Sequence, residues 1–230
     1  MPPHRQTRVQ RRLLAWAAAL AACALSSLAA AQDLPKPADL SPCAPNPDLK
    51  CVPVRLYVAL DGGGPVQDAP WIERQLHEAR WRFAPLGLDL QVVQILALPR
   101  DLAELTTPQD RDRLAAQLPV KPDALDVFLV ARLGDVDVPG EQLRGVHWRA
   151  HGQRFLILSR IAPPFVLAHE LGHYLGLPHG DHPQSVMNKA PREQPPWEER
   201  VFVQDELDAM RPVFRKLLRQ GRWVPLEAAR

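Results

Sequence analysis

Three histidines and one glutamate are crowded into residues 169 to 179, which read HELGHYLGLPH. On a helix with about 3.6 residues per turn, His169 and His173 lie one turn apart on the same face, so both imidazoles can reach one metal ion. Glu170 lies one step from the first histidine, where it is poorly placed as a ligand. It is well placed for a water molecule on the metal, so the pattern predicts a metal site with a carboxylate base.

Gly176 explains how the third histidine can reach the same metal ion. A glycine can turn the chain with a positive φ, and Pro178 reinforces the end of the helix, so His179 can return beneath the first two histidines. Three neutral imidazoles and one water make a tetrahedral zinc site with an open position, which is the catalytic arrangement. HExxH alone arises by chance in many helices, whereas HExxHxxGxxH is a specific signal.

The extended motif resembles the signature of the metzincin superfamily of zinc endopeptidases. The stretch HGDHPQSVMN places Met187 eight positions after His179, a spacing similar to the matrixin-like branch. The resemblance implies that Met187 belongs to a Met-turn beneath the metal. It also implies an α/β (α+β) zincin fold, with a twisted mixed sheet, an active-site helix and a small C-terminal subdomain. The specific match covers residues 169 to 188.

These residues predict hydrolysis of peptide bonds. A zinc ion would acidify a water molecule and polarise the scissile carbonyl, while Glu170 takes the proton and passes it to the leaving amine. The resemblance implies a protein or peptide substrate extended along an edge strand, for which GVHW (145 to 148) is the candidate. Two alternatives stay open: a non-catalytic zinc-binding scaffold protein, and a hydrolase of a non-protein amide such as a cell-wall crosslink. Glu170 favours the enzyme, because a non-catalytic site needs no base.

By the same resemblance, residues 188 to 197, NKAPREQPPW, form the wall of the pocket that receives the side chain just after the cut. The alternative interpretation is a solvated surface loop. The matrixin pattern is incomplete elsewhere. The usual pro-domain has no counterpart, because only the residues from 32 to 53 separate the expected signal from the first expected strand. No tyrosine follows Met187, and the residue after the third histidine is Gly180. The subfamily is therefore left open.

A second metal site is the less favoured interpretation of the remaining histidines. His147 and His151, with Asp135 and Asp137 upstream, contain suitable ligands for a structural zinc or calcium ion, but their spacing does not match such a site. A solvated strand and loop explains them better. His182 is expected on an exposed loop.

Strands and helices alternate along the chain before the motif, which predicts an α/β layer with a largely parallel sheet. No internal repeat or second domain boundary is visible. Pro163 and Pro164 are expected to open the helix that carries the motif. Pro212 is expected to delay or kink the last helix. The expected strands are 54–60, 88–98, 124–133 and two around GVHW and RFLILS; the other expected helices are 71–87, 110–118 and 204–218.

The first residues have the order of a secretory signal. Four arginines precede an apolar run and a small-residue stretch, so residues 1–31 are expected to be removed after Ala31. LAAC at residues 20 to 23 resembles a lipobox, and the alternative is a membrane-anchored lipoprotein through Cys23. A proline-rich leader, residues 32–53, then precedes the expected catalytic domain, residues 54–230. This domain is expected to have an upper subdomain, 54–176, and a lower subdomain, 177–230. Secreted or periplasmic export is expected by either route.

Removal of the signal also changes the charge. The whole chain carries 28 Lys/Arg against 26 Asp/Glu, a formal net charge of +2, and the loss of four arginines makes the balance negative. Nothing here indicates nucleic-acid binding, and a monomer is expected. Cys43 and Cys51 remain as a pair in an oxidising compartment, where we expect a disulfide.

Overall fold

The computed structural model describes residues 34–119, 122–189 and 195–227. The expected signal and the lipobox cysteine, Cys23, therefore lie outside the described residues. Within the described ranges, no helix combines the length and apolar character that crossing a membrane requires.

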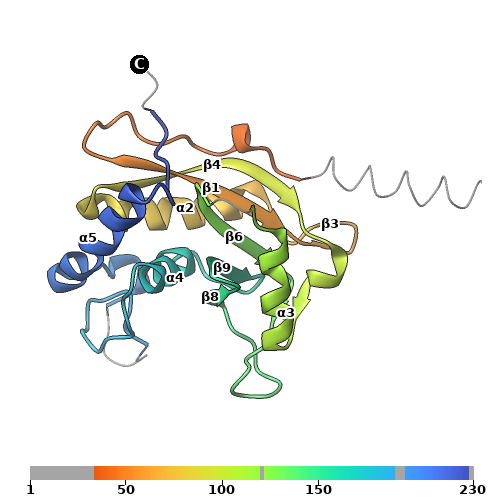
Figure 1. The fold of residues 1–230 in the computed structure, drawn as a ribbon. Helices are drawn as coiled ribbons and strands as arrows, with labels where there is room; N and C mark the ends of the chain where they lie inside the picture. The colour runs from red at the N-terminus through yellow and green to blue at the C-terminus, as the bar shows by residue number, and fades with distance from the viewer. Residues whose placement is uncertain (1–33, 120–121, 190–194, 228–230) are drawn as a thin grey trace, which may run out of the picture.

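A mixed five-stranded sheet forms the centre of the molecule, in the order β4-β1-β6-β9-β8 (Figure 1). The first four strands run parallel, and β8 pairs antiparallel with β9 at the edge. The apolar runs of β1 and β6 are buried along most of their length, as expected for strands covered on both faces. The mixed sheet confirms the expected fold class. The strand bounds are β1 (Lys50–Val58), β4 (Leu88–Ala97), β6 (Leu125–Val130), β8 (Gly145–Ala150) and β9 (Gln153–Ser159).

Four α-helices accompany this sheet in the described residues. Helix α2 (Ala69–Phe83) begins where the Asp68 side chain accepts a hydrogen bond from the Trp71 N–H, and it packs against α4 (Val166–Tyr174). Helix α3 (Pro108–Arg113) packs on the edge strand β8. Helix α5 (Gln204–Arg219) follows the motif region.

Short elements fill the connections. They are β2 (Leu60–Asp61), β3 (Gly64–Pro65), β5 (Glu104–Leu105) and β7 (Arg132–Leu133), with the 3-10 turns η1 (Pro37–Asp39), η2 (Ala84–Leu86), η3 (Arg100–Leu102), η4 (Leu114–Gln117) and η5 (Trp197–Glu199).

Several element boundaries differ from those expected; α2 ends at Phe83 and β6 at Val130, where the expected ends are 87 and 133. Strand β1 begins at Lys50, inside the expected leader. Pro53 is tolerated within it, because β1 pairs there with β4 and not yet with β6. The missing N–H of Pro53 therefore costs no ladder bond to β6. Helix 110–118 is shorter than expected, since α3 ends at Arg113 and continues as η4. Helix α5 runs through Pro212 without ending or starting there, and this residue lies on its exposed side.

The chain after α5 returns to the sheet. The Val224 N–H donates to the Asp123 carbonyl, and the Leu226 N–H donates to the Cys51 carbonyl, both at 2.9 Å. Trp223 is completely buried and stacks on Tyr174 of α4, with 5.4 Å between ring centroids. The residues after α5 are thus bonded to the main sheet and packed on α4. The division into subdomains at residue 176 remains a prediction.

Candidate metal centre

Helix α4 presents two histidines to one point, and a turn adds the third. The Nε2 atoms of His169 and His173 are 3.2 Å apart, and those of His179 lie 3.2 and 3.0 Å from them. A tetrahedral zinc ion with bonds of about 2.0–2.1 Å separates its nitrogen ligands by about 3.3 Å. The three imidazoles therefore fit a zinc ion, and they form the one group of three or more such ligands within the described residues.

Backbone carbonyls orient the two helical imidazoles. His169 Nδ1 lies 2.9 Å from the Val186 carbonyl, and His173 Nδ1 lies 2.7 Å from the Leu177 carbonyl. A carbonyl only accepts, so each Nδ1 carries the proton and each Nε2 keeps a lone pair for a metal.

Burial keeps these imidazoles neutral around pH 7. Desolvation lowers the pKa of His169 to about 4 and that of His179 to about 4, and the neighbouring imidazoles and Lys189 lower both further. Desolvation also lowers the pKa of His173. Metal ligands must be deprotonated, so the metal-free site is already in its binding form.

The turn after α4 has the expected form. Gly176 has φ 102°, a conformation that favours glycine, and the Leu177 N–H donates back to the Gly172 carbonyl. This turn reverses the chain so that His179 faces the helix.

Met187 is completely buried beneath α4. A Cβ atom at Gly172 would come within 2.7 Å of its Sδ, so the absence of a side chain there lets the methionine reach the helix. The Met187 N–H donates to the Ser185 hydroxyl, and its carbonyl accepts from the Gly180 N–H. The assignment of Met187 to a Met-turn stays a prediction.

Glu170 lies against the edge strand, since its Oε1 would be 3.1 Å from a Cβ at Gly145, and it lines the same cleft as the histidines. Its side chain is 6% exposed, and desolvation raises its pKa to about 8, while the backbone N–H of His147 and the charge of Lys189 lower it. The carboxylate lies against Gly145, because a Cβ there would come within 2.9 Å of Glu170 Cγ and 2.6 Å of Val166 Cγ1. The chain thus holds a proton-accepting group between α4 and β8.

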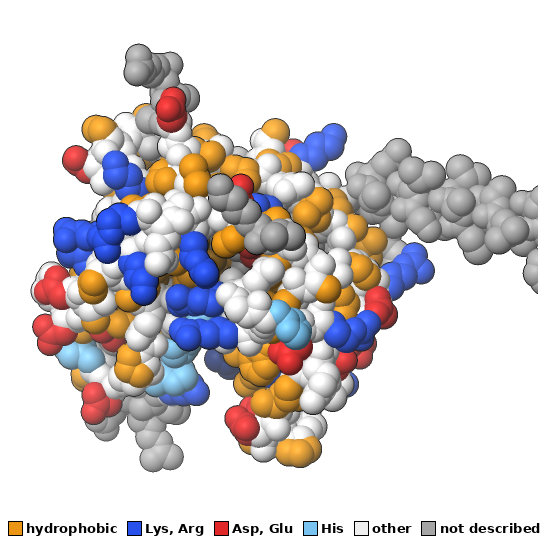
Figure 2. All heavy atoms as spheres, viewed as in Figure 1, with side chains coloured by type: hydrophobic (Ala, Val, Ile, Leu, Met, Phe, Trp, Pro, Cys, Tyr) orange, Lys and Arg blue, Asp and Glu red, His pale blue; other side chains and the backbone are white. Residues whose placement is uncertain are grey.

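A cleft of about 1100 Å³ contains all of these groups. It is lined by the three histidines, Glu170, residues 145–149 of β8 and the start of α4. Figure 2 shows it as a notch with histidine side chains on one wall. β8 is the edge of the main sheet on this side, so an extended chain in the cleft could pair with it.

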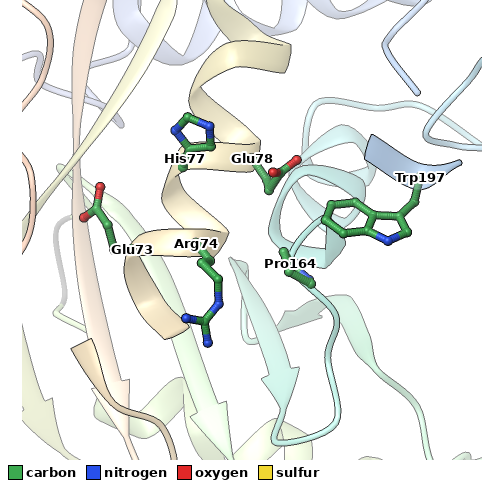
Figure 3. A pocket seen from close by; sticks show the side chains of 6 residues that line it. All are labelled: Glu73, Arg74, His77, Glu78, Pro164 and Trp197. Carbon is green, nitrogen blue, oxygen red and sulfur yellow. The ribbon is translucent and has the colours of Figure 1, made fainter. Parts of the chain in front are cut away.

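The wall after the Met-turn is partly described. Asn188, Lys189 and Trp197 line the cleft, as the sequence predicts, whereas residues 190–194 lie outside the described residues. Trp197 also borders a smaller cavity of about 280 Å³ against α2 (Figure 3). There the indole and Pro164 face the charged side of α2, which carries the exposed His77.

The other candidate ligands are dispersed. His147 packs its ring against Tyr174, with 5.4 Å between centroids, while His151 lies in the exposed turn after β8 with φ 50°. Asp135 accepts hydrogen bonds from the N–H groups of Asp137 and Val138 in its own loop. His182 is exposed, as expected.

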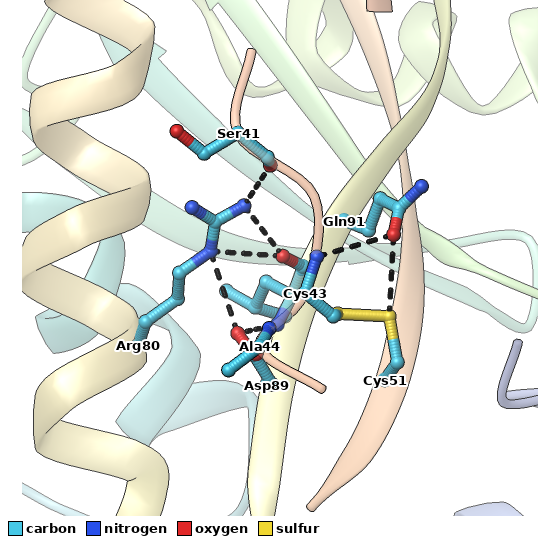
Figure 4. The surroundings of a disulfide bond; sticks show 8 residues. Ser41, Cys43, Ala44, Cys51, Arg80, Asp89 and Gln91 are labelled. Carbon is cyan, nitrogen blue, oxygen red and sulfur yellow. Dashed lines mark hydrogen bonds and ion pairs between the residues drawn. A yellow bond between two sulfur atoms is a disulfide. The ribbon is translucent and has the colours of Figure 1, made fainter. Parts of the chain in front are cut away.

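Cys43 and Cys51 are joined by a disulfide (Figure 4). The leader is also bound to the sheet around it, since the Cys43 N–H donates to Gln91 and the Ala44 N–H donates to Asp89. Arg80 of α2 donates to the Ser41 carbonyl. The leader is therefore fastened to β4, at the opposite side of the sheet from β8.

Sequence reasoning missed three residues that shape the site. Gly145 allows the approach of Glu170, and a glycine inside a strand is a known sign of such an approach. Arg154 of β9 donates to the Tyr174 carbonyl at the end of α4. Buried Arg82 of α2 donates to the carbonyls of Trp197 and Arg200, at 2.7 and 2.9 Å. No local pattern announces the last two, because their partners are distant in sequence.

Comparisons with known proteins agree with this geometry. Residues 144–212 match the family model of matrixin. The structure is similar to metalloproteinase-II from Bacteroides fragilis, with a TM-score of 0.53, 15% identity and 71% of this chain covered. The chain spans 53% of that protein, about half its length. Archaemetzincin from Methanopyrus kandleri aligns with a TM-score of 0.45, 15% identity and coverage of 72% and 96% of the two chains. No curated protein sequence matches the chain.

Proposed function

We propose that this matrixin-like zinc metallopeptidase is an exported endopeptidase that uses Glu170 as its general base. The observation that carries the proposal is the convergence of three imidazole Nε2 atoms in a cleft that also holds a buried carboxylate and an edge strand. Such a combination provides metal ligands, a proton acceptor and a place for an extended peptide.

Each group has a distinct role in the proposed reaction. A zinc ion held by His169, His173 and His179 would polarise the scissile carbonyl and lower the pKa of a water molecule. Glu170 would accept the proton of that water at its carboxylate and deliver it to the leaving amine. Burial raises the pKa of this carboxyl, and a more basic carboxylate is a better proton acceptor. The His147 N–H keeps the carboxylate oriented between the two steps.

The substrate would lie extended along β8. A free strand edge can bind a peptide backbone as an additional strand, which fixes the peptide without regard to most side chains. Selectivity would then come from the pockets along the cleft, including the wall around Lys189 and Trp197. We expect a monomeric enzyme that acts on proteins or peptides and not on nucleic acid.

Two sets of substitutions test the site. We expect about one zinc per chain in the purified protein and a large loss of zinc in His179→Ala, because two imidazoles hold the ion less well than three. In Glu170→Gln, zinc content and thermal unfolding should stay unchanged, while hydrolysis falls roughly 10²-fold or more. Metal analysis and assays on a peptide library measure both.

The outcomes separate the competing functions. Full zinc retention in His179→Ala would contradict the ligand assignment, and unchanged turnover in Glu170→Gln would place the base elsewhere. A zinc-loaded protein that cleaves no peptide would instead support a non-catalytic scaffold or a hydrolase of another amide.

Export is supported by the arrangement of the first 31 residues and by the disulfide, since disulfides persist in oxidising compartments. We expect a mature N-terminus near Gln32. Intact-mass measurement of protein purified from the producing cells distinguishes this from a lipidated Cys23. A cytoplasmic, full-length product with free thiols at Cys43 and Cys51 would contradict the proposal.

A further inference from the structure

Three arginines that form no ion pair in the described residues gather near the end of β8, and one of them, Arg149, lines the cleft. Arg149 of β8 lies directly across from Arg154 of β9, and Arg222 follows α5. None of the ion pairs within the described residues includes any of the three. We call Arg149, Arg154 and Arg222 the arginine cluster.

Aromatic stacking brings Arg222 to the two strand arginines. The Arg154 guanidinium lies over the Tyr174 ring, 4.3 Å from its centroid, and donates to the Tyr174 carbonyl. Trp223 stacks on the same tyrosine, and Arg222 is the residue before it. Burial lowers the pKa of Arg154, and the charges of Arg149 and Arg222 lower it further.

The cluster lies beside the path of a substrate along β8. Side chains alternate between the two faces of a strand, so Gly145, His147 and Arg149 share one face. Gly145 contacts Glu170, and Arg149 lines the same cleft. Arg149 is two residues, about 6–7 Å, along the strand from His147, whose N–H binds Glu170. Figure 2 shows Lys and Arg side chains gathered beside the histidines of the notch.

The opposite end of the cleft has a different charge pattern. Asp135 and Asp137 line it there, in the loop that precedes β8, and their charges act on Arg111. At the start of β8 the cations Arg111 and Arg144 share the cleft with Asp135 and Asp137. Lys189 and Arg200 add positive charge on the wall after the Met-turn, and apart from these two aspartates Glu170 is the one carboxylate among the described residues that line the cleft. The cleft can therefore distinguish acidic groups by their position along a bound peptide.

We propose that the arginine cluster is an anion-binding subsite that selects peptides with Asp or Glu on the segment lying along the end of β8. The proposal rests on the proposed peptidase function and specifies its substrates. Guanidinium groups bind carboxylates with paired, charge-assisted hydrogen bonds. Exposed Arg149 and half-buried Arg222 supply contacts, and Arg154 adds charge behind them. An antiparallel peptide would place its residues before the cut there, so acidic residues are selected about two or three positions before the scissile bond.

The first experiment compares cleavage profiles on a proteome-derived peptide library. Wild type should prefer Asp or Glu about two or three residues before the cut, by roughly 5-fold over Asn or Gln. The double variant Arg149→Gln/Arg222→Gln should lose this preference and keep its zinc and its cleavage of neutral peptides. Arg100→Gln, with an exposed arginine in η3 away from the cleft, is the control and should retain the preference. Cleavage by wild type without acidic preference, or an unchanged preference in the double variant, would overturn the proposal.

A binding measurement separates this proposal from the peptidase function. Fluorescence anisotropy with zinc-loaded Glu170→Gln compares two labelled Ala-rich peptides that carry either three Asp or three Asn in the N-terminal half. The Asp peptide should bind roughly 5-fold tighter at low salt, and the difference should shrink at high salt. If this difference is found but wild type cleaves nothing, the anionic site stands and the peptidase function fails. Equal affinities at low salt would overturn the anionic site whether or not peptides are cleaved.

Discussion

At the scale of single residues, the contact between Glu170 and Gly145 is the tightest constraint on the site. The carboxylate is held in place because one residue of the edge strand has no side chain. Any larger residue there would compete for the space of Val166 and Glu170, which are both buried.

We therefore predict that Gly145→Ala lowers both stability and turnover. The added methyl group would overpack the interface, at a cost of about 1–3 kcal/mol, and displace Glu170 from the His147 N–H. Urea unfolding and peptide hydrolysis measure the two effects, with zinc content expected to stay close to one ion per chain. Gly64→Ala is the control, since a Cβ there meets nothing within 4 Å. Equal behaviour of the two variants would show that the close approach is unimportant.

The burial of His147 makes the stability of the fold depend on pH. Burial lowers its pKa from 6.5 to about 3, and the charges of Arg154, Arg149 and His173 act in the same direction. Its ring is packed against Tyr174, and it faces no carboxylate except Glu170, whose contact is with its backbone. Because the folded-state pKa is depressed, the neutral ring favours folding above pH 6.5, and this contribution is lost as pH falls toward 3.

The predicted consequence is a reduced acid sensitivity of His147→Gln. In zinc-free protein, the free energy of unfolding of the variant should improve relative to wild type as pH falls below 6.5, by at most about 1.4 kcal/mol per pH unit. Urea unfolding between pH 7 and pH 4 in the presence of a chelator measures it. His77→Gln, on the exposed side of α2, should keep the wild-type pH dependence. A difference between His147→Gln and wild type that does not vary with pH would contradict the prediction.

At the scale of elements, α2 holds the wall of the cleft through one buried arginine. Arg82 is 1% exposed and forms an ion pair with Glu78 of its own helix. Its other nitrogens donate to the carbonyls of Trp197 and Arg200. A helix that precedes the metal motif by more than eighty residues thus positions the segment that follows it.

Replacing Arg82 by Lys should loosen this wall. Lysine keeps the charge but cannot reach Glu78 and both carbonyls, so we expect about 1–3 kcal/mol less stability and an altered preference for the residue after the cut. Zinc binding should remain, because the histidines do not contact Arg82. Arg74→Lys, on the exposed side of the same helix, controls for the loss of an arginine. An unchanged cleavage profile in Arg82→Lys would remove the segment around Trp197 from the specificity of the enzyme.

Elements with a strong local pattern could be predicted from the sequence. The β4 strand can be predicted within one residue because Leu88–Ala97 is rich in Leu, Val and Ile and is bounded by Gly87 and Pro99. The motif helix was predicted because its histidine and leucine spacings agree. The contacts of Arg82 and Arg154 could not be predicted, since they depend on which carbonyls the folded chain brings near. The last helix is not delayed by Pro212, because burial of Leu207, Met210 and Phe214 along it outweighs one missing helix bond, and the kink stays a prediction.

At the scale of the whole molecule, the disulfide and the metal site lie at opposite sides of the sheet. The strand order puts β1 and β4, with the leader, away from β8 and the cleft. The chain between the two cysteines is short, with a sequence separation of 8.

Removing the disulfide should therefore weaken the fold without changing the site. For Cys43→Ser/Cys51→Ser we expect a loss of about 2.5 kcal/mol, the value for closure of a loop of this size in the unfolded chain. Thermal unfolding with and without reductant measures it, and wild type in reductant should behave like the variant. Zinc content should not change. A loss of zinc in the folded variant would contradict the separation of the two regions.

The burial of Trp223 has a consequence for how the protein is made. Helix α4 and its histidines are synthesised about fifty residues before Trp223, so until then the Tyr174 ring is contacted by His147 and Arg154 but lacks the stacked indole. The Leu226 N–H also donates to the Cys51 carbonyl of β1, so a residue made late in synthesis binds to one of the first strands. A nascent chain therefore carries all three imidazoles before it can finish the surface behind them, and that surface is completed only after residues 223–226 have been made.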